Sequence, residues 1–295
     1  MKKALAYAAA VLCGSYTVAG ILYATGALNQ STRFVVSAFY MFLPAVVALI
    51  FDRIVYKNNL IDSWGLRFKF NCWLFSPPAI VLILVALTLA INPLFPGIRL
   101  LFDHIAASRN TMAPEQFEAA LPHLEMFPPG LFYLMQIGSG FVAGYTINAV
   151  FAFGEEVGWR GYLLNLFKGR PFWQAWLFTG ALWGVWHAPL ILLGHNYPDH
   201  PRIGVAMMTL VCVLLTPMFI YVRVKTKSIW GPSFLHGFFN ALSGLPHVML
   251  LGGNDLTIGV TGFAGIIALV VMNAALFVFD VCITKDRILV SDVSF

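Results

Sequence analysis

Residues 130–160 read GLFYLMQIGSGFVAGYTINAVFAFGEEVGWR. No charged residue occurs from Gly130 to Gly154, and two glutamates and an arginine then follow at once. An apolar run of about 20 residues is long enough to cross a bilayer as a helix. A charge at the centre of such a helix costs about 2.5 to 3.5 kcal/mol on insertion scales and usually marks function. The stretch therefore predicts a membrane-spanning helix that carries a functional polar segment.

The composition of the whole chain is that of an integral membrane protein. Of its 295 residues, 59% are hydrophobic and 11% are charged, whereas a soluble domain carries about 25% charged residues. The mean hydropathy is +0.79. The formal net charge is +5, but the basic residues are scattered between apolar runs and form no face for a phosphate backbone. We therefore expect membrane lipid around the chain and no nucleic-acid partner.

Several further segments are long and apolar enough to span a membrane. Strict apolar-polar alternation, which is typical of membrane barrels, is absent, so the spans are expected to be helices. The sequence predicts an all-α, polytopic fold of about eight transmembrane helices. No repeat or linker divides it, so residues 1–295 form one integral membrane domain, with the motifs in a core at about 130–252. The expected spans are 4–28, 34–51, 73–95, 130–154, 172–194, 204–224, 229–252 and 257–283.

The basic residues predict the topology of these spans. If Lys2 and Lys3 lie in the cytoplasm, most of the 18 Lys and Arg residues fall on that same side. The positive-inside rule then places both termini in the cytoplasm. The loop 96–129 lies on the opposite side, and Gln116 to Leu124 is expected to form a short amphipathic helix there. The short Lys-rich N-terminus and compact loops suit a prokaryotic cell membrane.

Three short motifs place ionisable or amide side chains in this apolar sequence: Glu155-Glu156-Val157-Gly158-Trp159-Arg160, Trp183-Gly184-Val185-Trp186-His187 and His236-Gly237-Phe238-Phe239-Asn240. On a helix, neighbouring residues point about 100° apart, so Glu155 and Glu156 face different directions. Glu156 and Arg160 have i,i+4 spacing and can pair. Glu155 is then left to face a cavity.

The other two motifs each place two side chains on one helix face. Trp183 lies one turn before His187, and His236 lies one turn before Asn240. Each motif also has a purely structural interpretation. The glutamates could cap the fourth span, His187 could be a hydrogen-bonded core residue, and polar side chains such as His236 and Asn240 often join membrane helices.

Depth decides whether the motifs can meet. Glu155 precedes the turn at 168–171 by nearly as many residues as His187 follows it, so at about 1.5 Å per residue both reach a similar depth. His236 is somewhat shallower. This convergence requires the fourth span to continue to about Phe167, which would make Arg160 intramembrane. A carboxylate and an imidazole could then deprotonate a water. A second imidazole and an amide could donate to the oxyanion formed at a carbonyl. The alternative is a bound zinc ion that polarises the water.

The ordered set of motifs resembles the CPBP family, which comprises CAAX prenyl proteases of the Ras-converting type and bacteriocin-processing or immunity (Abi) enzymes. The resemblance covers about residues 155–240 and the eight-span layout. It implies that Glu155 and His187 activate water and that His236 and Asn240 form an oxyanion hole, while Glu156 and Arg160 shape the site. Trp183 stands where the family pattern often has Phe and keeps an aromatic wall.

The resemblance leaves open whether the site holds a metal ion. The family is usually catalogued as metalloproteases, although a metal-free, glutamate-activated water has also been proposed for it. The implied alternatives are zinc held by Glu155, His187 and His236, or no metal. The usual HExxH helix is absent from the sequence.

The resemblance implies an intramembrane endopeptidase that acts on hydrophobic or lipidated peptides or proteins. Prenylated CAAX substrates follow only by analogy. The site would be reached from the cytoplasm or from the bilayer. Two other classes of protein also fit a polar site in a membrane: a non-proteolytic immunity or scaffold protein, and a small proton-coupled transporter that uses Glu155, Arg160 and His187 as a relay. A transporter would favour repeated halves, which the sequence lacks. The natural substrate, the cleavage position and the oligomeric state are not fixed by the sequence.

Overall fold

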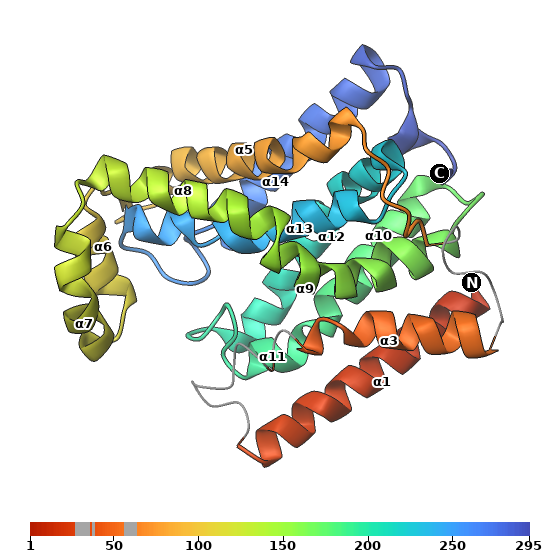
Figure 1. Cartoon of the computed structure of the whole chain (residues 1–295), viewed down its shortest axis with the longest axis horizontal. Helices are drawn as coiled ribbons and strands as arrows, with labels where there is room; N and C mark the ends of the chain where they lie inside the picture. The colour runs from red at the N-terminus through yellow and green to blue at the C-terminus, as the bar shows by residue number, and fades with distance from the viewer. Residues whose placement is uncertain (27–35, 37–38, 56–63) are drawn as a thin grey trace.

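The computed structural model describes residues 1–26, 36, 39–55 and 64–295, and these are mainly helical (Figure 1). Five helical stretches in this part of the chain are long and apolar enough to cross a membrane, and a bent pair makes up to six. The chain is thus an all-α integral membrane protein. The five stretches are Lys2–Ala24, Cys72–Leu94, Phe172–Leu192, Pro201–Thr226 and Phe263–Ile283, and the bent pair is Pro129–Tyr145 with Ile147–Leu163.

The individual elements follow the chain in this order. The α-helices are α1 (Lys2–Ala24), α3 (Leu43–Leu49), α5 (Ser76–Ile91), α6 (His104–Thr111), α7 (Pro114–Glu125), α8 (Pro129–Tyr145), α9 (Ile147–Glu156), α10 (Phe172–Trp186), α11 (Ala188–Leu192), α12 (Pro201–Thr226), α13 (Trp230–Leu242) and α14 (Phe263–Val278). The π-helical turns are η1 (Ile50–Val55), η4 (Val157–Leu163) and η6 (Phe279–Ile283). The 3-10 turns are η2 (Cys72–Phe75), η3 (Asn92–Leu94), η5 (Leu245–Val248) and η7 (Ile288–Val290). Strands β1 (Arg99–Leu100) and β2 (Leu250–Leu251) pair antiparallel.

Two of the eight expected spans do not reach spanning length among the described residues. The expected span 34–51 lies partly outside them, and its described part forms α3 and the start of η1. The expected span 229–252 contains α13, which has 13 residues. At about 1.5 Å per residue this helix is about 20 Å long, shorter than the hydrocarbon core of about 30 Å. After Ser243 the chain leaves α-helical geometry and forms a 3-10 turn and then β2.

The fourth expected span is bent, and it continues beyond residue 154, where it was expected to end. The helix axis turns by 47° between α8 and α9, at Thr146, whose backbone leaves helical geometry. The helix then runs through Glu155 and Glu156 into η4 and on to Asn165. The extension that the depth argument required is therefore present. Such π-helical turns occur frequently at functional sites.

Glycines let α13 approach α8 and α9 closely. A Cβ at Gly237 would lie 2.8 Å from the backbone nitrogen of Ala149, and one at Gly144 would lie 2.8 Å from the ring of Phe238. Small residues are common at the crossings of membrane helices because they let the two backbones approach closely. In Figure 1, α9, α10, α12 and α13 lie in the middle, between α1 with α3 and α5 with α14.

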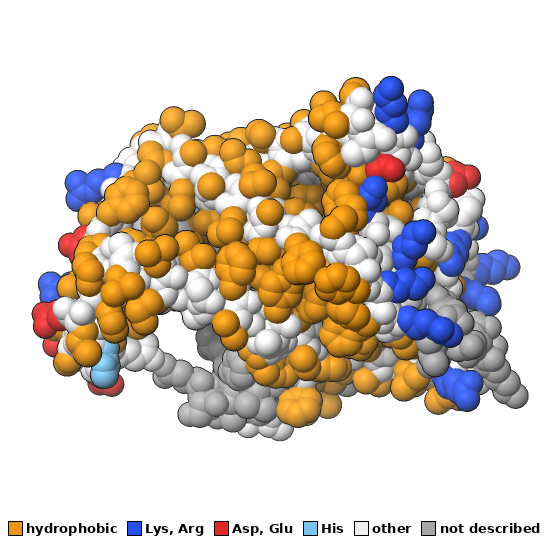
Figure 2. All heavy atoms as spheres, turned by 45° about the horizontal axis from the view of Figure 1, so that its top comes forward, with side chains coloured by type: hydrophobic (Ala, Val, Ile, Leu, Met, Phe, Trp, Pro, Cys, Tyr) orange, Lys and Arg blue, Asp and Glu red, His pale blue; other side chains and the backbone are white. Residues whose placement is uncertain are grey.

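The molecule has two chemically different ends. Both termini lie at one end (Figure 1), and most Lys and Arg side chains visible in Figure 2 gather at this end, while hydrophobic side chains cover the middle. The hairpin of α6 and α7 lies at the opposite end. Helix α7 covers the expected amphipathic segment 116–124 and buries Phe117 and Leu124. The cytoplasmic location of the basic end stays a prediction.

Candidate active site

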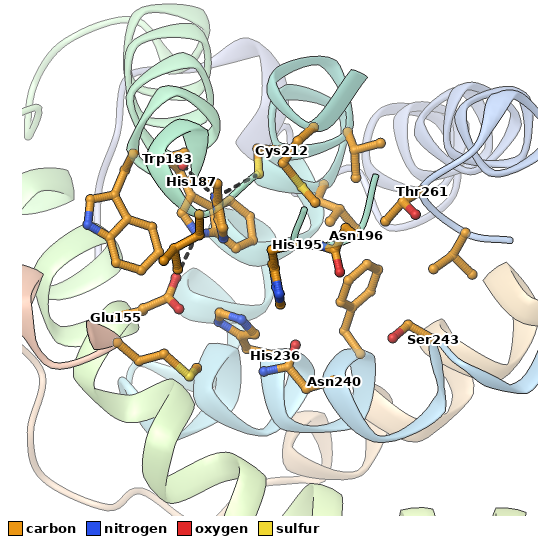
Figure 3. A pocket seen from close by; sticks show the side chains of 18 of the residues that line it. Glu155, Trp183, His187, His195, Asn196, Cys212, His236, Asn240, Ser243 and Thr261 are labelled. Carbon is orange, nitrogen blue, oxygen red and sulfur yellow. Dashed lines mark hydrogen bonds between the residues drawn. The ribbon is translucent and has the colours of Figure 1, made fainter. Parts of the chain in front are cut away.

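The three motifs meet at one cavity of about 460 Å³. Figure 3 shows Glu155, His187, His236 and Asn240 around this space, with Trp183 beside them. Glu156 and Arg160 lie behind the cavity wall, and both are fully buried. The structure therefore brings together all seven residues that the motifs nominated, five in the wall and two behind it.

Glu155 stands at the end of α9 and presents one carboxylate oxygen to the cavity. It is 2% exposed. Its Oε2 accepts hydrogen bonds from the indole Nε1 of Trp183 at 2.7 Å and of Trp159 at 3.4 Å. Its Oε1 has no hydrogen-bond partner among the described residues. This oxygen is the one available to a water or a substrate.

Glu156 links two of the motifs. Its Oε1 accepts from Nη1 of Arg160 at 2.9 Å and from Nδ1 of His236 at 2.9 Å. The i,i+4 pair expected from the sequence is thus present, and the bond to His236 is an additional contact that sequence spacing did not indicate. A buried carboxylate with two charge-capable donors holds both of them in fixed positions.

The guanidinium of Arg160 is enclosed by aromatic rings. Its Cζ lies 4.3 Å from the ring centroid of Trp183 and 4.4 Å from that of Phe219, and Nη2 donates to Oγ1 of Thr216 at 3.3 Å. Desolvated cation–π contacts of this kind are worth about 2 kcal/mol. Arg160 therefore supplies the positive charge beside Glu156 without entering the cavity.

His187 lies where α10 gives way to α11. Pro189 has no N–H, so the carbonyl of Val185 loses its usual i+4 donor. The hydroxyl of Tyr16 in α1 donates to that carbonyl instead, at 2.8 Å. Nδ1 of His187 is 2.8 Å from the carbonyl oxygen of Trp183. A carbonyl can only accept, so Nδ1 carries the proton, and Nε2 of the neutral ring keeps a lone pair.

His236 and Asn240 offer different chemistry at the floor of the cavity. Because Nδ1 of His236 faces the carboxylate of Glu156, its Nε2 donates only when the ring is an imidazolium; in the neutral ring it accepts. The expected oxyanion role of His236 therefore depends on its protonation. The side-chain amide of Asn240 has no partner in the described part of the chain, and its two N–H groups are available at the cavity.

The side chains do not fit the zinc alternative. Among the described residues, no three His, Cys, Asp or Glu side chains are grouped so that they could hold a metal ion. Glu155, His187 and His236 line the same cavity but do not form such a group.

The cavity continues beyond the motifs into residues that the sequence did not single out. His195, Asn196, Ser243, His247 and Thr261 also line it. They come from the loops after α11 and α13 and before α14, where no spacing rule connects them. No sequence pattern indicates that His195 and His247 face the same space as Glu155.

Two comparisons bear on identity. A family model for type II CAAX prenyl endopeptidases, Rce1-like, matches residues 121–242. The CAAX prenyl protease 2 of Methanococcus maripaludis is 28% identical over 192 residues, which cover 62% of this chain and 62% of that protein. The chain thus spans less than two thirds of the length of this curated relative. The matched segment contains all three motifs and the cavity floor. Over this segment the chain is similar to Rce1-like proteins, and the structure assembles the three motifs of the segment at one cavity.

Proposed function

We propose that the chain is an intramembrane endopeptidase that hydrolyses peptide bonds in membrane-associated proteins or peptides. One observation carries the proposal: a carboxylate oxygen of Glu155 and Nε2 of His187, both acceptors, face the same cavity as the side-chain amide of Asn240, which no other described residue engages. Acceptors that can take a proton from water, set beside a donor that can stabilise an oxyanion, are the requirements of metal-free amide hydrolysis.

The proposed reaction begins with a water held by Oε1 of Glu155 and Nε2 of His187. The water oxygen attacks the scissile carbonyl carbon, and the proton that it loses passes to this pair. The carbonyl oxygen becomes an oxyanion. When the tetrahedral intermediate collapses, the C–N bond breaks and the leaving nitrogen takes the proton back from the Glu155–His187 pair.

The oxyanion is stabilised from the α13 side. The amide N–H groups of Asn240 donate to it in either protonation state of the site. His236 adds a second donor when its ring is charged, and Glu156 stabilises that charge through the 2.9 Å contact at Nδ1. Loss of one oxyanion donor typically lowers the rate by about 10² to 10³-fold. Glu156 and Arg160 act by positioning these groups and balancing their charge.

The substrate class follows from the surroundings of the cavity. The cavity lies among membrane-spanning helices, so a hydrophobic or lipidated peptide reaches it through the bilayer or from one membrane surface. The relative named above is a CAAX prenyl protease, which makes a prenylated peptide the first substrate to test. The cavity runs from Glu155 toward the loops at the end opposite to most basic residues.

The test is cleavage of a prenylated, internally quenched peptide by the full chain in liposomes. Glu155→Gln and His187→Ala are expected to abolish turnover, and Asn240→Asp, which keeps the shape but loses the donor, is expected to reduce it strongly. Turnover that survives these substitutions contradicts the proposed mechanism, whereas no turnover by the unsubstituted chain favours a non-proteolytic scaffold.

A further inference from the structure

An apolar groove lies on the outer surface of the helix bundle, between α5, α12 and α14. Its volume is about 610 Å³, and no described residue lines both this groove and the cavity at Glu155. Ile83 of α5 and Ile283 of η6 line the groove and are 53% and 66% exposed. Figure 2 views the molecule from the side of α5 and α14, which hydrophobic side chains cover. The groove is therefore open to hydrocarbon chains of the surrounding lipid.

The wall of the groove is suited to an alkyl chain. Apolar side chains of three helices supply nearly all of it. Its two hydroxyl groups are used inside the protein, since Ser76 donates to the carbonyl of Trp73 at 2.8 Å and Tyr221 donates to the carboxylate of Asp286 at 3.5 Å. A wall of this kind gains by covering hydrocarbon, and a wholly polar ligand would lose its hydration there without replacement.

A positioned ammonium stands where α5 begins and α14 ends, at the basic end of the molecule (Figures 1 and 2). Nζ of Lys225 lies 4.9 Å from the ring centroid of Trp73 and 6.0 Å from that of Tyr221, and both rings line the groove. Nζ also donates to Oδ2 of Asp286 at 2.7 Å. An ammonium has three N–H donors, and Asp286 is its one acceptor among the described residues. Two donors therefore remain for a ligand.

The turn after η6 adds two cations next to Asp286. Lys285 and Arg287 flank it in the chain, and both are exposed. Both also have positive φ, 59° and 56°, a conformation that side chains other than glycine adopt only where the surrounding structure holds it. Buried Asp280 holds the turn, because its carbonyl accepts from the N–H of Arg287 at 3.3 Å and its carboxylate accepts from two further backbone N–H groups. Together with Lys225, the end of the groove carries an excess of positive charge.

We propose that this groove binds one anionic glycerophospholipid of the surrounding bilayer. An acyl chain lies against the apolar wall, and the phosphate accepts hydrogen bonds from Lys225, while Lys285 and Arg287 attract its charge. Trp and Tyr side chains are typical of the depth at which lipid phosphates lie, and basic pockets between membrane helices suit anionic head groups. A free phosphate would leave the wall uncovered, and an uncharged chain would leave the cations unused. The site is independent of the proposed peptide hydrolysis.

The head group is tested by native mass spectrometry of the full chain, titrated with dioleoyl phosphatidylglycerol or dioleoyl phosphatidylcholine. One phosphatidylglycerol is expected to bind about tenfold more tightly than phosphatidylcholine, as fits a hydrogen bond to a charged group. Lys225→Ala is expected to remove most of this preference, and Lys285→Ala combined with Arg287→Ala to lower it severalfold. Arg202→Ala, which removes an exposed cation in the first turn of α12, should keep it. Equal binding of the two lipids, or a full preference in both sets of variants, overturns the proposal.

The acyl chain is tested with two neighbouring exposed alanines of α14, of which Ala275 lines the groove and Ala274 does not. Ala275→Trp fills the groove and is expected to weaken phosphatidylglycerol binding at least about tenfold, whereas Ala274→Trp should leave it unchanged. Thermal unfolding checks both variants, and if Ala275→Trp protein does not fold, the exposed Lys285 and Arg287 variants decide. Unchanged binding in folded Ala275→Trp protein overturns the proposal, as does displacement of the lipid by glycerol phosphate alone or by a prenylated peptide.

Discussion

Trp183 joins the two charged parts of the site. Its indole N–H donates to Oε2 of Glu155 at 2.7 Å, and its ring face lies 4.3 Å from Cζ of Arg160. A phenylalanine at this position, as the family pattern often has it, would keep the ring face and lose the donor. Trp183 therefore fixes which oxygen of Glu155 faces the cavity, a role that an aromatic wall alone does not provide.

Trp183→Phe tests this role. The carboxylate of Glu155 loses its shortest hydrogen bond and can rotate, so kcat is expected to fall about tenfold with KM and thermal stability little changed. Trp176→Phe is the matched control, because Trp176 lies on the same helix and donates to the carbonyl of Val213 away from the cavity. An equal loss in both variants, or none in Trp183→Phe, contradicts the role.

The sequence predicted contacts within one helix better than contacts between helices. The Glu156–Arg160 pair follows from i,i+4 spacing, which fixes both side chains on one face. The bond between Glu156 and His236 joins residues 80 positions apart. Its existence depends on how α13 crosses α9, which no local pattern encodes, and it changes the chemistry available at Nε2 of His236.

At the scale of the elements, breaks in two helices determine where the side chains of the site lie. The apolar runs 130–154 and 172–194 were each predicted as one continuous span. The sequence around Thr146 and around His187 remains apolar, so the helix breaks at these two positions were not predicted. Pro189 was the one local signal, since proline removes a helix hydrogen bond. The freed carbonyl of Val185 is satisfied by Tyr16 from α1. Helix α1 therefore supports the break that presents His187 to the cavity.

Tyr16→Phe is expected to leave the Val185 carbonyl without its donor. The loss is about 1 kcal/mol of unfolding free energy, with a modest fall in cleavage because the break at His187 becomes less rigid. Thermal unfolding in detergent and peptide cleavage measure the two effects. Tyr23→Phe changes an exposed tyrosine of the same helix and should alter neither. Unchanged stability in Tyr16→Phe would show that α1 does not support the break.

At the scale of the whole molecule, charge and cavity point to opposite ends. Lys and Arg gather at the end that holds both termini, whereas the cavity opens from Glu155 toward the loops at the other end. The composition and the basic residues were enough to predict a helical membrane protein with two unlike ends. They could not predict that α13 is too short to span, because its apolar sequence continues past the point where the backbone leaves the helix.

The orientation is tested with single cysteines in a background in which the exposed Cys13, Cys72 and Cys282 are serine. Lys69→Cys lies at the basic end and Glu118→Cys on α7 at the opposite end. The positive-inside rule predicts that a membrane-impermeant maleimide labels position 118 in intact cells and position 69 only after permeabilisation. The reverse pattern would place the basic end outside.

In the proposed mechanism, Glu155 activates the water that cuts the peptide. Its most direct test is the cleavage rate of a prenylated quenched peptide by Glu155→Gln protein in liposomes, with products identified by mass and folding checked by thermal unfolding. Glu125→Gln, an exposed glutamate of α7, is the matched control. We predict a loss of at least about 10²-fold for Glu155→Gln with normal unfolding, and no loss for Glu125→Gln. Cleavage by folded Glu155→Gln protein at the unsubstituted rate would contradict the account.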